Sequence, residues 1–246
     1  MLPKFKYQLK NSRAQMVHSY SLQYDAKSWL DLIKLLPHQE LPDRFSKFCD
    51  ERKSEYLAGR FCAHTSIKVC RPSTPLLSIR TGPGNEPIWP EGLVGSITHS
   101  NGFCSAVVAE SKLLQSIGID SELIMTPDQA RETNTVFLTQ SEIQEYQTEY
   151  YRNLSFPEYA TLIFSAKESL FKCLYPLVGE MFDFQDSIIY QIDSDSGQFK
   201  YALTKSLSEI FPQDYIGIGS FILTSTHVHT GIQLRNEDYF IASQRA

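Results

Sequence analysis

The chain lacks any apolar run of about 20 residues, the length that a membrane-spanning helix needs. Its opening, MLPKFKYQLK, lacks the apolar core of a secretory signal, so we expect no membrane segment and no export. The five cysteines are odd in number and form no CxxC pair. They predict reduced thiols in a cytoplasmic protein rather than a disulfide scaffold or a zinc site.

An excess of basic residues is also missing. Lysine and arginine total 23 against 28 acidic residues, which gives a formal net charge of -5. This balance argues against a nucleic-acid-binding protein, although it does not exclude a local basic pocket for a phosphorylated small molecule. With 246 residues, 42% of them hydrophobic, the chain is long enough for one large domain or two of about 100–150 residues.

Helical spacing is clearest in three segments. Residues 43–70 mix apolar and charged side chains at helical intervals and end before Pro72. A stretch rich in proline and glycine follows, which predicts a loop with one short extended piece at residues 76–80. Further helices are expected over residues 139–151, with a Thr or Ser cap, and 156–174, with a break at Pro176.

Three strand-like runs occupy residues 94–99, 103–110 and 116–122, and Asn101-Gly102 between the first two predicts a hairpin. We interpret the three as a meander, which would bring His99 close to Asp120 and Glu122. The tail predicts strands at residues 187–192, 197–203, 217–228 and 238–242. The order of elements favours an α+β fold of two similar halves that divide near residue 118.

The segment SIGIDSELI ends a partly buried strand on two carboxylates, Asp120 and Glu122. Side chains alternate along a strand, so these two share one face while Ser121 takes the other. Like charges at this spacing repel and are tolerated more easily around a cation. The alternative is a solvated strand end in a mildly acidic protein.

A second group of charged residues lies in FSAKESLFK, where Glu168 and Lys172 are i,i+4 neighbours on a helix. Alone, they would be a helix-stabilising ion pair of a few tenths of a kcal/mol. Arg52 and Arg60 stand about 80° apart around their predicted helix, and surface arginines are common. His99 alone would be a polar residue beside a turn.

Together these residues fit one chemistry. Mg²⁺ prefers one or two carboxylates plus phosphate oxygens, and arginines with a histidine can hold a terminal phosphate. A carboxylate beside a lysine can take a proton from an attacking hydroxyl while the lysine neutralises the leaving group. The combination predicts a Mg²⁺-dependent enzyme that acts on a polyphosphate.

The segments VGSITHS, SIGIDSE and FSAKESLFK, in this order and at these separations, strongly resemble the 4′-phosphopantetheinyl transferases. The similarity is closest to the branch of the enterobactin-synthase component D enzymes. It is densest over residues 89–122 and 159–176 and reaches back more loosely to about residue 51. The resemblance implies a pseudo-dimeric α+β fold with coenzyme A bound between two similar halves. It also implies transfer of the phosphopantetheine arm to a serine of a carrier protein, with release of 3′,5′-adenosine bisphosphate.

The resemblance also implies a role for each matching residue. Mg²⁺ would be bound by three carboxylates, Asp120, Glu122 and Glu168, and Glu168 would also be the base for the serine hydroxyl. The phosphates would be contacted by Lys167 and Lys172, and Lys172 would assist the leaving group. The nucleotide and its 3′-phosphate would be held by Arg52, Arg60, Thr98 and His99. Residues 1–118 would thus contact the nucleotide, and residues 119–246 would carry the metal and catalytic groups.

The partners implied are coenzyme A and the apo acyl, peptidyl or aryl carrier domains of nonribosomal peptide, polyketide or fatty-acid type synthases. We expect a monomer that docks its carrier partly on residues 123–140. Two departures from the family stand out. Gly84-Asn85-Glu86 occupies the place before Pro87 where relatives often carry a basic residue, which Arg80 would replace, and Ser100 stands in place of a cysteine.

Two alternatives from other classes remain. One is a carrier-binding module that keeps the fold but has lost catalysis, against which the presence of all the predicted metal and catalytic residues speaks. The other is a different Mg²⁺-dependent phosphotransferase or phosphohydrolase acting on a nucleotide, for which no acceptor protein would be needed. His227 and His229 could form a metal pair on one strand face, but without a third ligand nearby an exposed strand is the better interpretation.

Overall fold

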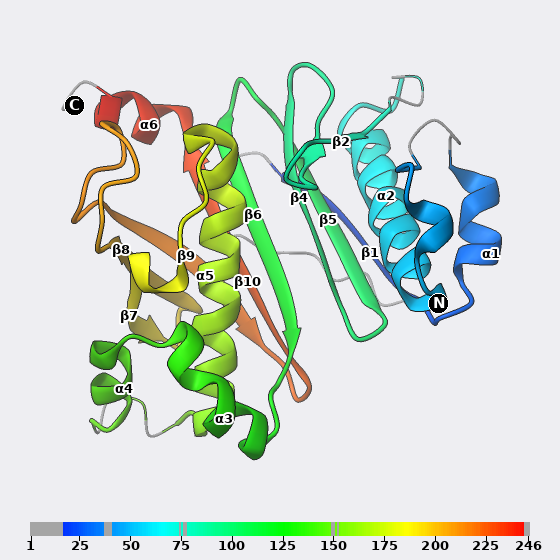
Figure 1. Cartoon of the computed structure of the whole chain (residues 1–246). Helices are drawn as coiled ribbons and strands as arrows, with labels where there is room; N and C mark the ends of the chain where they lie inside the picture. Colours follow the sequence, from blue (N-terminus) through cyan, green and yellow to red (C-terminus); the bar gives the residue numbers. More distant parts are fainter. Residues whose placement is uncertain are drawn as a thin grey trace. The chain divides into compact units, whose positions relative to one another are not determined.

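The computed structural model describes residues 17–243, except for residues 37–40, 74, 76, 77, 149, 150 and 152. The chain forms two compact units, residues 1–115 and 116–246, which we describe one at a time (Figure 1). Both contain helices and strands, so the predicted α+β class is confirmed. Among the described residues, no helix is long and apolar enough to cross a membrane. The extended piece predicted at residues 76–80 lies partly outside the described residues.

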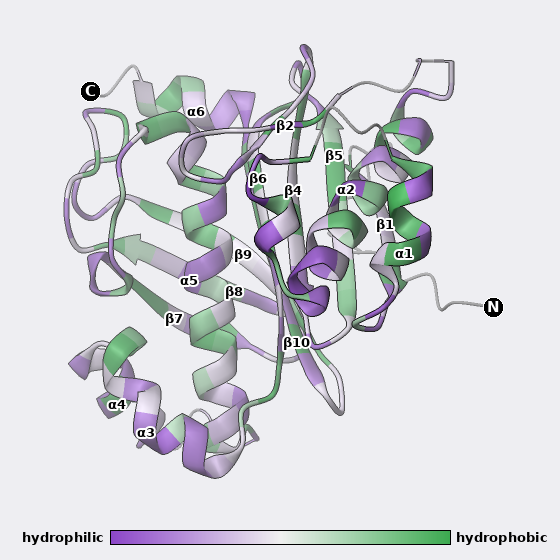
Figure 2. Cartoon of the chain, turned by 45° about the vertical axis from the view of Figure 1, so that its right-hand side comes forward, coloured by the Kyte–Doolittle hydropathy of each residue, from purple (hydrophilic) through white to green (hydrophobic). Residues whose placement is uncertain are grey.

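The first unit is built on a three-stranded antiparallel sheet in the order β1-β5-β4. The strands are β1 (Val17–Gln23), β4 (Leu93–Ser100) and β5 (Phe103–Glu110). The predicted hairpin is confirmed, because Ser100 pairs with Phe103 and both turn residues, Asn101 and Gly102, have positive φ. The central strand β5 is hydrophobic along most of its length (Figure 2), and only its last residue is not buried.

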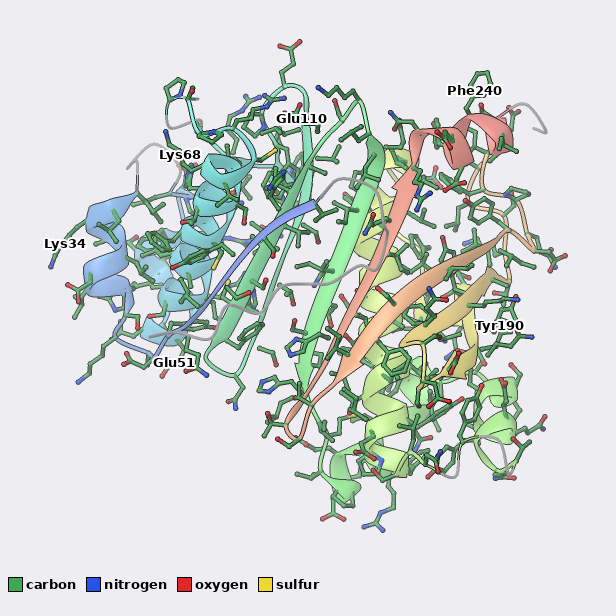
Figure 3. All side chains as sticks on the ribbon, turned by 180° about the vertical axis from the view of Figure 1, so that it is seen from behind. Lys34, Glu51, Lys68, Glu110, Tyr190 and Phe240 are labelled. Carbon is green, nitrogen blue, oxygen red and sulfur yellow. The ribbon has the colours of Figure 1, made fainter. Side chains whose placement is uncertain are left out.

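Helix α2 (Asp50–Cys70) covers this sheet and supplies most of its apolar partners. The predicted helix over 43–70 is thus shorter at its start, where a separate 3-10 turn spans Phe45–Lys47. Arg71, directly after α2, donates to Glu110 at the end of β5 over 2.7 Å from Nε and 2.5 Å from Nη2. Hydrogen bonds from Arg71 lower the pKa of Glu110. The ion pair between Arg71 and Glu110 thus joins the end of the helix to the sheet. Figure 3 labels Glu110, and Lys68 of α2, at this end of the unit.

The predicted meander is wrong in its third strand. Strand β6 (Leu114–Leu123) does not extend the hairpin of β4 and β5 but lies at the edge of a second sheet. The short loop after β5 made a meander plausible, yet β6 finds its partner in β10, more than a hundred residues later. The inference that His99 lies close to Asp120 therefore loses its basis in strand order and stays a prediction.

The second unit has a five-stranded sheet in the order β6-β10-β9-β8-β7. Its other strands are β7 (Ser187–Asp193), β8 (Gln198–Leu203), β9 (Ile216–Leu223) and β10 (His227–Arg235). The run predicted as one strand at 217–228 is divided by the turn between β9 and β10. The last predicted strand, at 238–242, is wrong, because those residues belong to the short helix α6 (Asn236–Ser243).

Helix α5 (Phe156–Val178) crosses one face of this sheet (Figure 1). It begins at a capping box in which Glu158 N donates to Ser155 Oγ and Ser155 N donates to Glu158. The helix runs through Pro176 and ends at Gly179, whose φ of 72° suits a C-terminal glycine. The break predicted at Pro176 is thus wrong, because a proline so close to the end removes only one internal hydrogen bond.

Two shorter helices precede α5. Helix α3 (Pro127–Phe137) was not predicted, and α4 (Gln140–Tyr146) forms the first half of the helix predicted over 139–151. Both begin at a threonine capping box, and the one at α4 joins Thr139 to Glu142. In Figure 1 both helices lie near the N-terminal end of α5.

The imidazole of His229 on β10 contacts the neighbouring edge strand β6, where its Nδ1 lies 2.9 Å from Ser121 Oγ. The side chain is only 5% exposed. Burial and the nearby His227 lower the pKa of His229 to about 4, although the charge of Asp120 acts in the opposite direction. His229 is therefore neutral in the folded protein and hydrogen-bonds to the middle residue of the Asp120–Glu122 segment.

The low pKa of His229 predicts a specific loss of stability in acid. Because an unfolded histidine titrates near 6.5, the unfolded chain binds this proton first as the pH falls. The free energy of unfolding should decrease between about pH 6.5 and pH 4, by up to about 3 kcal/mol from this residue. In urea unfolding measured across this range, His229→Gln should flatten the pH dependence more than His227→Gln does. Parallel curves for wild type and His229→Gln would contradict the assignment.

Candidate active site

In the second unit, alternate residues of β6 face helix α5. Ser116 Oγ donates to the carbonyl of Cys173 at 2.6 Å. A Cβ placed on Gly118 would lie 2.0 Å from the carbonyl oxygen of Ser169 and 2.6 Å from the amide nitrogen of Cys173. Only glycine allows the backbones of strand and helix to approach this closely. Asp120, two residues further along the same face, therefore points towards the side chains of α5.

Lys172 on α5 meets Asp120 directly, with 2.6 Å between Nζ and Oδ1. Asp120 is almost fully buried, with 3% of its side chain exposed, whereas 28% of Lys172 remains accessible. Burial alone would lower the pKa of Lys172, but the charges of Asp120, Glu168 and Glu122 outweigh it and raise the pKa. The lysine is therefore a firmly protonated cation with part of its surface available to an anionic ligand.

Glu168 lies one helical turn before Lys172 and is partly buried. Desolvation raises its pKa, Lys172 acts in the opposite direction, and the nearby charge of Asp120 adds to the increase. A carboxylate with a raised pKa is a stronger base than an exposed one. The predicted i,i+4 pair is thus part of a larger group in which Lys172 binds Asp120 and stabilises the charge of Glu168.

The three predicted metal ligands are Asp120, Glu122 and Glu168. Within the described ranges, no three His, Cys, Asp or Glu side chains lie close enough together to hold a metal ion. Asp120 Oδ1 accepts a hydrogen bond from the ammonium of Lys172, and the assignment of the three carboxylates as metal ligands stays a prediction. The donor set still fits Mg²⁺, which needs only one or two protein carboxylates and takes its remaining ligands from water and phosphate.

Lys167 does not join this group. Its ammonium donates to the carbonyls of Phe137 at 2.8 Å and Phe184 at 2.9 Å and to Glu142 Oε2 at 2.8 Å. A lysine has three N–H donors, so all of them are used, and only 1% of the side chain is exposed. This placement speaks against the predicted phosphate contact of Lys167. Its neighbour Glu168 points elsewhere because successive helical residues are rotated by about 100°.

Sequence reasoning missed the partner of Lys167. Glu142 is 1% exposed and accepts hydrogen bonds from Thr139 N at 2.7 Å and from Ile189 N at 2.8 Å, in addition to Lys167. The Thr or Ser cap expected for this helix accounts for the first of these contacts. It gave no sign of the others, which connect α4 to α5 and to β7. This buried pair fixes the helix that carries Glu168 and Lys172.

In the first unit, Arg52 and His99 are brought together as predicted. Arg52 extends from the first turn of α2 and its Nη1 lies 3.4 Å from His99 Nε2 and 2.9 Å from Glu55 Oε2. Its guanidinium carbon also lies 5.8 Å from the centre of the Phe48 ring. The pair can therefore present a cation and an imidazole to the same anion.

Arg60, two turns further along α2, is 4% exposed. It donates to Thr81 Oγ1 at 2.8 Å and to Tyr56 Oη at 3.2 Å. Thr98 differs from the other predicted nucleotide ligands. Ile97 on β4 faces α2, because its Cγ2 lies 3.0 Å from a Cβ placed on Gly59. Side chains alternate along a strand, so His99 also faces α2 and the side chain of Thr98 faces the opposite side.

Two family models match the chain, one in each unit. The 4′-phosphopantetheinyl transferase N-terminal domain matches residues 41–109, and the 4′-phosphopantetheinyl transferase superfamily matches residues 116–224. The chain belongs to this superfamily. The second match contains the strand of Asp120 and Glu122 and the helix of Glu168 and Lys172.

Curated relatives agree with this membership. Enterobactin synthase component D of Salmonella typhimurium is 37% identical over 154 residues, which cover 61% of this chain and 58% of the relative. A 4′-phosphopantetheinyl transferase of Streptomyces mobaraensis is 34% identical over 151 residues, with the same coverage. One of Mycobacterium tuberculosis is 28% identical over 172 residues, covering 69% of this chain and 72% of that protein. The chain thus spans little more than half the length of the first two.

The close approach at Gly118 predicts that Gly118→Ala is destabilising. The added methyl group forces the backbones of β6 and α5 apart, which should cost about 1–3 kcal/mol despite the better strand propensity of alanine. Ser116→Ala, which removes only the hydroxyl bond to Cys173, should cost about 1 kcal/mol and serves as the control. Urea unfolding of both variants measures the difference. An unchanged midpoint for Gly118→Ala would contradict the packing constraint.

The Lys167–Glu142 pair gives a second prediction. Lys167→Met leaves a buried carboxylate without its cation and should lower the free energy of unfolding by about 3–5 kcal/mol. Adding Glu142→Gln removes the stranded charge, and its single amide oxygen still accepts from either Thr139 N or Ile189 N, so the double variant should be more stable than Lys167→Met alone. Lys205→Met breaks an exposed pair with Asp186 and should cost less than about 1 kcal/mol. Equal effects at the two lysines would refute a special role for the buried pair.

Proposed function

We propose that this protein transfers the 4′-phosphopantetheine arm of coenzyme A to a serine hydroxyl of an apo carrier protein domain. The observation that carries the proposal is the meeting of Lys172 and Asp120 beside Glu168 within a segment that matches the superfamily. A carboxylate of raised pKa can take the proton of an attacking hydroxyl, and a protonated lysine can neutralise the charge that develops in phosphoryl transfer. Curated relatives named as 4′-phosphopantetheinyl transferases support the same activity.

In this proposal, the serine oxygen attacks the phosphorus that carries the pantetheine arm. The bond from that phosphorus to the bridging oxygen breaks, and 3′,5′-adenosine bisphosphate leaves. Glu168 takes the proton of the serine hydroxyl, a role that its raised pKa supports. Lys172 neutralises the charge that develops on the leaving phosphate, since its ammonium remains partly accessible.

Asp120 and Glu122, with Glu168, would be the residues that hold Mg²⁺. The ion, when bound, would supply positive charge to the pyrophosphate oxygens. Asp120 already binds a cation in the form of the Lys172 ammonium, which supports its role as a ligand for positive charge. In the first unit, Arg52, His99 and Arg60 would bind the nucleotide end of coenzyme A.

The acceptor would be a carrier domain of a nonribosomal peptide, polyketide or fatty-acid type synthase. The similarity to enterobactin synthase component D makes carrier domains of siderophore synthesis the first to try. The experiment is intact-mass spectrometry of an apo carrier domain incubated with the protein, coenzyme A and Mg²⁺. A mass gain of one phosphopantetheine that a chelator abolishes is expected. No gain on carriers of all three types would favour a module that binds carriers without catalysis.

Glu168→Gln tests the base within the same assay. Removing the proton acceptor should lower the transfer rate by about 10²–10⁴-fold. The amide is similar in size and Lys172 keeps its partner Asp120, so coenzyme A should bind with little change in calorimetry. Glu180→Gln, on an exposed residue just beyond α5, is the matched control and should leave the rate unchanged. Turnover near the wild-type rate in Glu168→Gln would remove this residue from the base role.

A further inference from the structure

The first unit contains a third arginine beside Arg52 and Arg60 that sequence reasoning did not single out. Arg44 immediately precedes the 3-10 turn before α2 and is exposed. Its guanidinium carbon lies 5.8 Å from the centre of the Phe48 ring, the same distance as that of Arg52. One aromatic ring thus carries two arginines, one of which also contacts His99.

The backbone at Arg44 is firmly placed. Phe45, the next residue, is 8% exposed and packs edge-on against Phe48 and Tyr56 at centroid distances of 5.9 and 6.1 Å. This contact anchors the turn in the core of the unit and thereby fixes the backbone from which the Arg44 side chain extends.

The guanidinium of Arg44 is also oriented. Its Nη2 donates to Oδ1 of Asn85, which lies in the turn between β2 (Arg80–Thr81) and β3 (Pro87–Ile88). Hydrogen bonds from Asn85 N to Gly82 O at 3.0 Å and from Gly82 N to Glu86 O at 2.8 Å define this turn. The hairpin is therefore bound by two arginines, by Arg60 through Thr81 and by Arg44 through Asn85.

These contacts leave an excess of positive charge. In the part of the chain that the structure describes, Arg44, Arg52 and Arg60 form a single ion pair, which joins Arg52 to Glu55. Three guanidinium groups against one carboxylate favour an anion with more than one negative charge, in a protein whose net charge is -5.

Arg80 was expected to supply the basic group that the Gly84–Glu86 segment lacks. Successive side chains of a strand point to opposite faces, and Thr81 faces Arg60 and Tyr56. Arg80 therefore points to the other face of the hairpin, and its side chain is exposed. Arg44 reaches the hairpin turn itself through Asn85.

We propose that Arg44, oriented by Asn85, binds the terminal 3′-phosphate of coenzyme A together with Arg52 and His99. This inference rests on the proposed function for the identity of the ligand. A terminal phosphate monoester carries nearly two negative charges at neutral pH and accepts hydrogen bonds from several guanidinium groups. Arg44, which precedes α2 and contacts Asn85, thereby supplies the basic group that the Gly84–Glu86 turn lacks.

Calorimetric titration with 3′,5′-adenosine bisphosphate and with adenosine 5′-monophosphate tests the proposal without depending on transfer activity. Arg44→Ala should weaken binding of the bisphosphate about tenfold and leave binding of the monophosphate nearly unchanged. Arg80→Ala removes the same charge from the hairpin that Arg44 contacts and should alter neither affinity. Asn85→Gly tolerates the φ of 68° and removes only the amide, so an intermediate loss for the bisphosphate is expected.

Equal losses for the two nucleotides in Arg44→Ala, or equal effects of Arg44→Ala and Arg80→Ala, would overturn the assignment. A transfer assay with several apo carrier domains separates this failure from that of the proposed function. If wild type transfers the arm and Arg44→Ala raises only the KM for the carrier, Arg44 belongs to a docking surface and the proposal is wrong. If wild type binds the bisphosphate as predicted but transfers nothing, the proposed activity fails while the role of Arg44 stands.

Discussion

The ion pair between Lys172 and Asp120 is the interaction on which the candidate site of the second unit depends. It exists because β6 and α5 approach each other until their backbones nearly touch at Gly118, so that side chains on the facing surfaces meet directly. The buried aspartate is satisfied by the lysine, and the lysine keeps its charge through the surrounding carboxylates. Burial and the charge of Asp120 raise the pKa of Glu168, and the cation of Lys172 lies one helical turn away from it.

Two lysines five residues apart on α5 illustrate how burial decides function. Lys167 is enclosed by two carbonyls and Glu142 and contributes to the fixed geometry of the unit. Lys172 has one strong partner and part of its surface accessible. The same side chain is thus structural in one place and suited to bind phosphate in the other, and the surroundings alone make the difference.

Local signals in the sequence were sufficient for many elements. The Asn101-Gly102 hairpin, the cap at Thr139 and the strand that carries Asp120 follow from neighbouring residues and are found in the structure. Long-range pairing was not predictable in this way. The partner of β6 is β10, and nothing within β6 distinguishes that neighbour from the hairpin before it.

The candidate site shows the same limit. The motifs identified Glu168, Lys172 and Asp120, but their spacing could not show that Lys167 binds Glu142, because that contact depends on how α4 and β7 pack. The short run at 238–242 also misled, since its aromatic and β-branched residues favour a strand while the chain forms a helix after β10. Arg44 was missed because its role depends on Asn85, 41 residues later in the chain.

The adjacent placement of Lys167 and Glu168 has a consequence for how this chain can change in length. The start of α5 is fixed by its cap at Ser155, so one residue inserted between Ser155 and Ala166 would turn every later side chain by about 100°. Lysine would then occupy the position of Glu168, and alanine the buried position of lysine. Single insertions and deletions in α5 should therefore be tolerated far less than substitutions.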